Sequence, residues 1–78
     1  MEYNTKDLYI DSTLSYNLGK LVDIHMQYLD EVKEFKGVLE KVFKDHLIIS
    51  DHTTGKWTIL PLFYLNHIVF EEEIDFPK

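Results

Sequence analysis

Apolar and polar positions alternate most clearly along residues 20–28. One set of alternate positions holds Val22, Ile24, Met26 and Tyr28, and the other holds Leu21, Asp23, His25 and Gln27. Because successive side chains of a β-strand point to opposite faces, this pattern predicts a strand with one face in the core and one in water. The acidic stretch that follows, residues 29–34, is expected to be a solvated loop.

Further apolar runs, separated by turn signals, predict four more strands, over residues 35–43, 46–50, 56–60 and 67–72. The strongest turn signal is Asp51-His52-Thr53-Thr54-Gly55, where the aspartate accepts backbone hydrogen bonds and the glycine takes a left-handed conformation. Pro61 cannot donate to a strand ladder and is expected to end the fourth strand. Residues 62–65 are then expected to form one helical turn. Residues 9–17 predict a short helix that ends at Gly19.

Gly37 lies inside the second predicted strand, where a glycine usually marks a bulge or a sharp bend. Five short strands with such a bend predict a mainly β fold: a small five-stranded SH3-like or Sm-like barrel with a short N-terminal helical segment. Closure would remove exposed sheet edges. The alternative is an open five-stranded meander that dimerises through an edge. We expect the core to contain Val22, Ile24, Val38, Val42, Leu47, Ile49, Ile59, Ile68 and Phe70.

The 78 residues are enough for one domain. We expect a disordered arm over residues 1–8, a single barrel domain over residues 9–74 and a frayed tail over residues 75–78. A chain of this length buries only about 60 to 65% of its unfolded surface. It contains no cysteine, so neither a disulfide nor a thiolate metal site can add stability. Oligomerisation is the remaining way to bury more surface.

The charge distribution argues against polyanionic partners. The net charge is −6, and all eight basic residues are lysines. Phosphate binding needs a basic face, and base recognition relies on arginine, so we expect no nucleic-acid partner and no binding to an anionic membrane surface. No segment approaches the ~18 apolar residues of a membrane span, and the N-terminus has no signal-peptide pattern. Synthesis in the cytoplasm is therefore expected.

Four histidines, at positions 25, 46, 52 and 67, raise the question of a metal site. None is spaced four residues from another, and there is no cysteine to support them, although His46 and His67 lie on strands that can be adjacent. The pairs Asp45-His46 and Asp51-His52 have no evident nucleophile or pocket, and Ser50 is assigned to turn chemistry. We expect no catalytic residue, no metal and no cofactor, and hence no enzyme.

Eleven aromatic residues are more than a barrel of this size can hide. An exposed aromatic patch marks an interface, so we expect the protein to bind a protein partner or itself. The residues expected at this interface are Tyr9, Tyr16, Phe63 and Tyr64.

The order of short motifs resembles the core domain of the spore coat protein GerQ family of Bacillus-type bacteria. The motifs are Tyr9-Ile10-Asp11, Leu18-Gly19-Lys20, Gly37-Val38-Leu39-Glu40, Asp45-His46-Leu47-Ile48-Ile49-Ser50-Asp51, Thr54-Gly55-Lys56, Leu60-Pro61-Leu62-Phe63-Tyr64-Leu65 and Ile68-Val69-Phe70-Glu71-Glu72-Glu73-Ile74. They extend over residues 9–74, and the motifs DHLIISD and YLxxIxFEEEI are distinctive together.

This resemblance implies a non-catalytic component of the spore coat with a role in germination. It also implies anchoring of a cortex-lytic hydrolase and cross-linking by transglutaminase, for which Lys6 and Gln27 are the candidate residues. The alternative function is an Sm-like RNA-binding protein, which rests on barrel topology alone.

Overall fold

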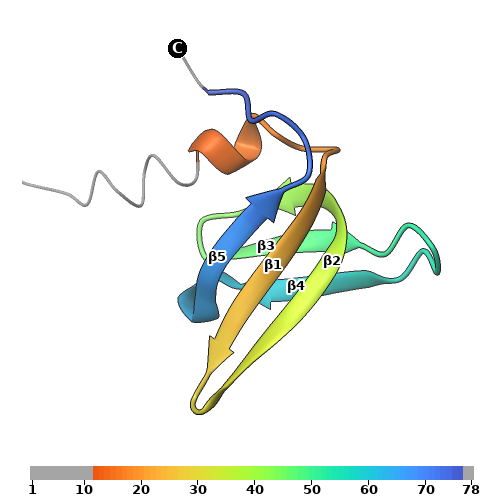
Figure 1. Ribbon diagram of the computed structural model, residues 1–78. Helices are drawn as coiled ribbons and strands as arrows, with labels where there is room; N and C mark the ends of the chain where they lie inside the picture. Colours follow the sequence, from red (N-terminus) through yellow and green to blue (C-terminus); the bar gives the residue numbers. More distant parts are fainter. Residues whose placement is uncertain (1–11, 77–78) are drawn as a thin grey trace, which may run out of the picture.

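The protein is described by a computed structural model that covers residues 12–76. Its core element is one antiparallel sheet of five strands in the order β4-β3-β2-β1-β5 (Figure 1). The strands are β1 (Leu21–Tyr28), β2 (Glu31–Val42), β3 (His46–Ser50), β4 (Trp57–Pro61) and β5 (Leu65–Phe70), with the short 3-10 helix η1 (Leu62–Tyr64) before β5. The mainly β class and the number of strands predicted from the sequence are confirmed.

The sheet is strongly bent, so that β3 and β4 cross the direction of β1 and β5 (Figure 1). The twelve-residue strand β2 belongs to both halves: its first part pairs with β1, and its last part pairs with β3. The bulge in β2 lies between Leu39 and Lys41, whereas pairing with β1 is regular at Gly37. The prediction of a bend in this strand therefore holds, but the bulge is displaced from the glycine.

Gly37 is needed for close packing rather than for an unusual backbone angle. A Cβ atom at this position would lie far inside van der Waals contact with the carbonyl oxygen of Ser50 on β3. Only a residue without a side chain lets β2 pass this close to the end of β3. The glycine thus sits where the two halves of the sheet meet.

The ladder of strands is not closed among the residues that the structure describes. β4 and β5 form the two edges of the sheet, and no pairing joins them. The closed barrel expected from the sequence is therefore not observed, and both edges keep backbone groups that face away from the sheet.

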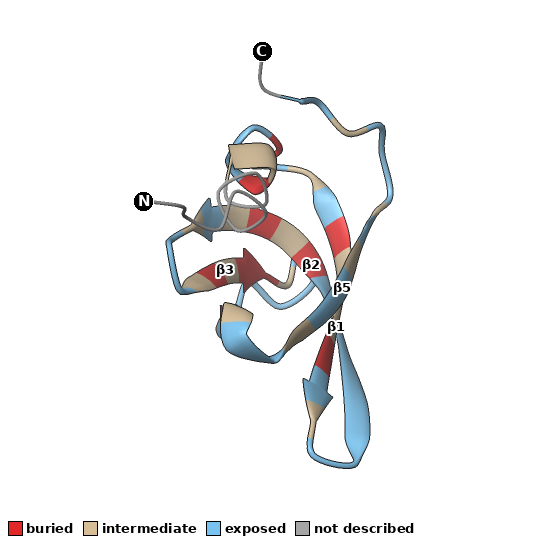
Figure 2. Ribbon diagram, turned by 90° about the vertical axis from the view of Figure 1, so that its left-hand side faces the viewer, coloured by how far each residue is buried: buried red, intermediate tan, exposed pale blue. Residues whose placement is uncertain are grey.

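The core lies in the concave side of the bent sheet (Figure 2). Its fully buried members are Leu14, Val22, Ile24, Met26, Leu39, Leu47, Ile49 and Leu60. Val42, Ile68 and Phe70 are half-buried against them, as part of the predicted core. Two core predictions are wrong: Ile59 is 63% exposed while Leu60 is buried, and Val38 is only half-buried while Leu39 is buried. At each of these two places, neighbouring residues on opposite faces of the strand are both apolar. The alternation pattern therefore could not show which of the two faces the core.

The first hairpin differs most from the expected layout. Residues 29–34 were expected to be a loop, but β2 begins at Glu31, and only Leu29 and Asp30 form the turn. The side chains of the added residues, 31–34, are exposed, so cross-strand pairing rather than burial extends the strand. β1 and β3 match the predicted strands to within one residue. β5 begins at Leu65 rather than at residue 67.

A buried asparagine joins the two ends of the described chain. Residues 12–15 form one helical turn, and Gly19 follows in a left-handed conformation with φ of 90°. Asn17, fully buried, donates from Nδ2 to the carbonyl oxygens of Thr13 at 2.6 Å and Asp75 at 2.8 Å. Its Oδ1 accepts from the backbone N–H of Asp75 and from Lys20 Nζ, both at 2.8 Å. Residue 75, the first of the expected tail, is therefore attached to the domain.

Candidate functional site

Three metal-ligating side chains meet on the convex face of β1 and β2. Asp23 and His25 are two residues apart on β1, so they share a face, and Glu34 is the direct cross-strand partner of His25. His25 Nε2 lies 3.4 Å from Asp23 Oδ1 and 3.7 Å from Glu34 Oε2. One ligand atom from each residue lies within 4.8 Å of the other two. We call Asp23, His25 and Glu34 the histidine–carboxylate cluster.

A second imidazole packs on this cluster from β5. His67 stands opposite His25 in the register, and the two rings stack with centroids 4.2 Å apart and an interplanar angle of 12°. His67 Nδ1 lies 2.8 Å from Asn66 Oδ1. The histidine that pairs with His67 is therefore His25 rather than His46, which lies in β3 beside the far edge of the sheet.

The cluster is not evident from the sequence because its ligands come from two strands. The pattern Asp23-x-His25 signals two ligands on one strand face. Glu34 joins them only because the hairpin turn is two residues long, and the sequence reading placed this glutamate in a loop. The expectation of no metal rested on the spacing of the histidines and on the absence of cysteine, and it did not consider carboxylates from a neighbouring strand.

The convex face of β3 and β4 carries apolar side chains instead. Ile48 on β3 stands opposite Ile59 on β4, and Trp57 lies on the same face of β4, two residues before Ile59. Trp57 is 58% exposed and Ile59 63% exposed. Phe43 stacks on His46 at 4.5 Å and extends this surface past the end of β2. We call Phe43, Ile48, Trp57 and Ile59 the β4 apolar face, and it adjoins an unpaired strand edge.

A smaller aromatic group surrounds η1. Phe63, 88% exposed, contacts Tyr64 edge to face at 5.2 Å, and Tyr64 contacts Tyr28 at the same distance. Lys33 Nζ lies 5.9 Å from the centre of the Tyr28 ring. Two of the residues expected at an interface, Phe63 and Tyr64, are thus adjacent and open to solvent.

Other candidate residues lie elsewhere. Tyr16 is exposed, and its helical turn and η1 lie at opposite ends of β5 (Figure 1, Figure 2), so within one chain it is not part of the aromatic group around η1. Gln27 lies in β1 with its side-chain amide bonded at both ends, to the Glu31 carbonyl and to Asn66. Lys6, Tyr9 and the expected arm over residues 1–8 lie outside the described residues.

The two Asp-His pairs form local contacts. Asp45 Oδ1 lies 2.6 Å from His46 Nδ1, and this hydrogen bond lowers the pKa of the Asp45 carboxyl. The backbone N–H groups of Thr53 and Thr54 donate to Asp51 and lower the pKa of its carboxyl. The Ser50 hydroxyl donates to Glu40 Oε2 at 2.5 Å.

The geometry around Ser50 does not assemble a catalytic site. Four residues of extended chain, or about 13 Å, separate His46 from Ser50. Within residues 12–76 no hydrogen bond joins a serine or threonine hydroxyl to a histidine.

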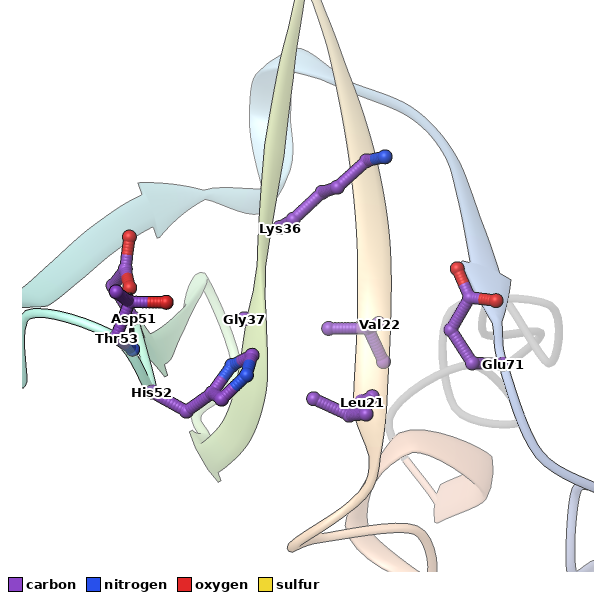
Figure 3. Close-up of a pocket in the computed structure, with 8 residues that line it drawn as sticks. All are labelled: Leu21, Val22, Lys36, Gly37, Asp51, His52, Thr53 and Glu71. Carbon is purple, nitrogen blue, oxygen red and sulfur yellow. Dashed lines mark hydrogen bonds between the residues drawn. The ribbon is translucent and has the colours of Figure 1, made fainter.

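A pocket of about 490 Å³ lies beside Gly37 (Figure 3). Its lining residues are Leu21, Val22, Lys36, Gly37, Asp51, His52, Thr53 and Glu71. The charged side chains among them have both signs and do not point toward one common position in Figure 3, so they do not indicate a particular ligand.

Residues 12–76 therefore define a small, mainly β domain with two contrasting surfaces. Residues 5–76 match the family model described as spore coat protein, Spore_GerQ. The chain is 38% identical over 73 residues to the spore coat protein GerQ of Bacillus subtilis (strain 168). The chain belongs to the GerQ family of spore coat proteins, which confirms the resemblance found in its motifs.

The match with the Bacillus subtilis protein includes 88% of this chain but only 40% of the length of that relative. The chain thus spans less than half of the curated relative that it matches. In the described part of the chain, no helix is both long enough and apolar enough to cross a membrane.

Proposed function

We propose that the protein is a non-catalytic assembly module of the spore coat that binds a second copy of itself or another coat protein. Membership of a spore coat family supports the location. The observation that carries the assembly role is the β4 apolar face, where Trp57 and Ile59 are more than half exposed on an edge strand. An exposed apolar edge strand is a template for pairing with another chain.

The arrangement suits association by strand addition. A strand that pairs with the free edge of β4 would form backbone hydrogen bonds and extend the sheet, and its side chains would cover Trp57 and Ile59. A two-fold axis at this edge would pair β4 with its own copy, which is the commonest closed arrangement of identical chains. Phe63 and Tyr64 provide a second contact surface on the segment that follows β4.

We infer that the fold is an open form of the SH3-like or Sm-like barrel. The strand order β4-β3-β2-β1-β5, the bulge in β2 and the 3-10 helix between β4 and β5 support this assignment. In such a fold the two outer strands remain available for partners, which agrees with an assembly role.

The experiment is light scattering after size-exclusion chromatography over ~10 to 200 µM protein, a range suited to small interfaces. The wild-type mass should rise with concentration, and Ile59→Lys should keep the protein monomeric because a charge replaces a central apolar contact. Val32→Lys is the matched control, since Val32 is similarly exposed but lies on the β1–β2 hairpin. Phe63→Ser measures how much the aromatic residues around η1 contribute to self-association.

A wild-type protein that stays monomeric throughout this range excludes self-association. Coat proteins and cortex-lytic hydrolases, the partners implied by the family resemblance, would then be tested by titration against wild type and Ile59→Lys.

Binding to single-stranded RNA tests the alternative function. Micromolar binding that weakens steeply with salt would favour the Sm-like alternative, whereas a net charge of −6 leads us to expect none.

A further inference from the structure

The histidine–carboxylate cluster contains a carboxylate oxygen without a partner. Asp23 Oδ1 is buried and accepts no hydrogen bond from any residue that the structure describes. Lys36 stands opposite Asp23 in the register, yet no ion pair joins them in residues 12–76. His25 Nε2 is the near neighbour at 3.4 Å, without the alignment of a hydrogen bond. Buried polar atoms of this kind call for an explanation, and an ion is one.

The spacing within the cluster fits ligands around one small cation. Bonds of about 2.0 to 2.2 Å from zinc to nitrogen or oxygen, at tetrahedral angles, place neighbouring ligand atoms about 3.4 Å apart. His25 Nε2 lies 3.4 Å from Asp23 Oδ1 and 3.7 Å from Glu34 Oε2. The Glu34 side chain is about half exposed, so it has room to rotate toward an ion held by the other two residues.

We propose that Asp23, His25 and Glu34 form a site for a divalent transition-metal ion of the zinc class. The two carboxylates balance the double positive charge, and the imidazole selects zinc-like ions over Mg²⁺ and Ca²⁺, which prefer oxygen ligands alone. The stacked ring of His67 fixes the plane of the His25 ring. Three protein ligands leave a coordination position free for water or for a group from a bound partner.

Binding would connect both strands of the first hairpin. Asp23 and His25 belong to β1, Glu34 belongs to β2, and His67 packs against them from β5. A ligand that binds only the folded state stabilises it by mass action. The ion would therefore stabilise the half of the sheet that lacks the β4 apolar face, so the site is independent of the proposed assembly surface.

The test is calorimetric titration of the metal-free protein with Zn²⁺, together with thermal unfolding with and without Zn²⁺. We expect one ion per chain. At a free zinc concentration about 100 times Kd, the unfolding midpoint should rise by roughly 10 to 20 °C. Mg²⁺ at the same concentration should leave the midpoint unchanged. Substitution with Co²⁺ should give the intense visible absorption of a four-coordinate site.

Three variants decide whether the cluster is the site. Asp23→Asn and His25→Gln should each weaken Zn²⁺ binding by more than ~100-fold, beyond the loss typical of a residue that only supports a ligand. Asp23→Asn keeps the size of the side chain and removes a buried charge, so it should fold without the ion. His46→Gln is the matched control, since His46 contacts a single carboxylate in the described structure, that of Asp45.

Zinc binding that survives in both Asp23→Asn and His25→Gln would place the ion elsewhere and overturn the proposal. The absence of zinc binding in the wild-type protein would do the same. In that case the cluster is a set of contacts between the His25 ring and the two carboxylates that holds no ion.

Discussion

The two halves of the bent sheet share one core and differ on their convex faces. On β1, β2 and β5 that face carries the histidine–carboxylate cluster and His67. On β3 and β4 the convex face carries Ile48, Trp57 and Ile59. Ile48 and Ile59 are direct cross-strand partners, as His25 and Glu34 are in the other half. The same alternation of side chains therefore turns histidine and carboxylate side chains outward in one half and apolar side chains outward in the other.

This difference shows that a strand pattern assigns faces but does not assign their roles. In β1 the outer face is polar, so the inner face is obvious from the sequence. In β4 both faces carry apolar residues, and the outer set is surplus to what the core needs. A surplus of exposed apolar residues on an edge strand is the signal of a contact surface.

Two isoleucines test the contrast between core and convex face most strongly. Ile49 on β3 is 3% exposed, whereas Ile59 on the neighbouring strand is open to solvent. Ile49→Ala should lower the free energy of unfolding by ~2 to 5 kcal/mol through lost burial and a cavity, and Ile59→Ala should change it by less than ~0.5 kcal/mol. Chemical denaturation of both variants at a concentration where the protein is monomeric provides the measurement. Equal losses would mean that the face of β4 is assigned wrongly.

Asn17 tests the link between the two ends of the described chain, which meet beside the half of the sheet that carries the histidine–carboxylate cluster. Asn17→Ala would leave the Asp75 backbone N–H and two carbonyl oxygens without partners, so we expect a loss of ~2 to 3 kcal/mol. Hydrogen exchange should show faster exchange of the Asp75 amide. Ser15→Ala, at an exposed position of the same turn, is the control. An unchanged Asp75 amide would contradict the role of Asn17 as the link between both ends.

Gly37 tests the junction between the halves. Gly37→Ala would place a methyl group against the Ser50 carbonyl and force β2 and β3 apart, at a cost of ~1 to 3 kcal/mol. Thermal or chemical unfolding measures this loss, and Lys36→Ala, at the neighbouring exposed position, should change stability by less than ~0.5 kcal/mol. If Gly37→Ala melts like the wild-type protein, the close approach of the strands is not required for the bend.

Sequence information sufficed where a residue pattern had a single structural meaning. The alternation in residues 20–28 and the run at residues 46–50 gave the correct strands, and the motif order gave the correct family. It did not suffice where the outcome depends on contacts between distant residues. The start of β2 follows from cross-strand pairing of exposed residues, and the histidine–carboxylate cluster follows from the hairpin register.

The smallest expected effect is a pH dependence of stability that comes from Asp51 in the turn after β3. Hydrogen bonds from Thr53 and Thr54 lower the pKa of Asp51 in the folded state, so its charge stabilises the fold fully at pH values above the unfolded pKa of about 3.9. This contribution is lost as the pH falls through the folded-state pKa. Asp51→Asn keeps an oxygen that can accept the same hydrogen bonds and removes the charge. The wild-type protein should therefore be slightly more stable than Asp51→Asn near neutral pH, and denaturation at decreasing pH should show the two curves converging. A difference that stays constant down to acidic pH would mean that the charge of this turn does not contribute to the stability of the apolar half.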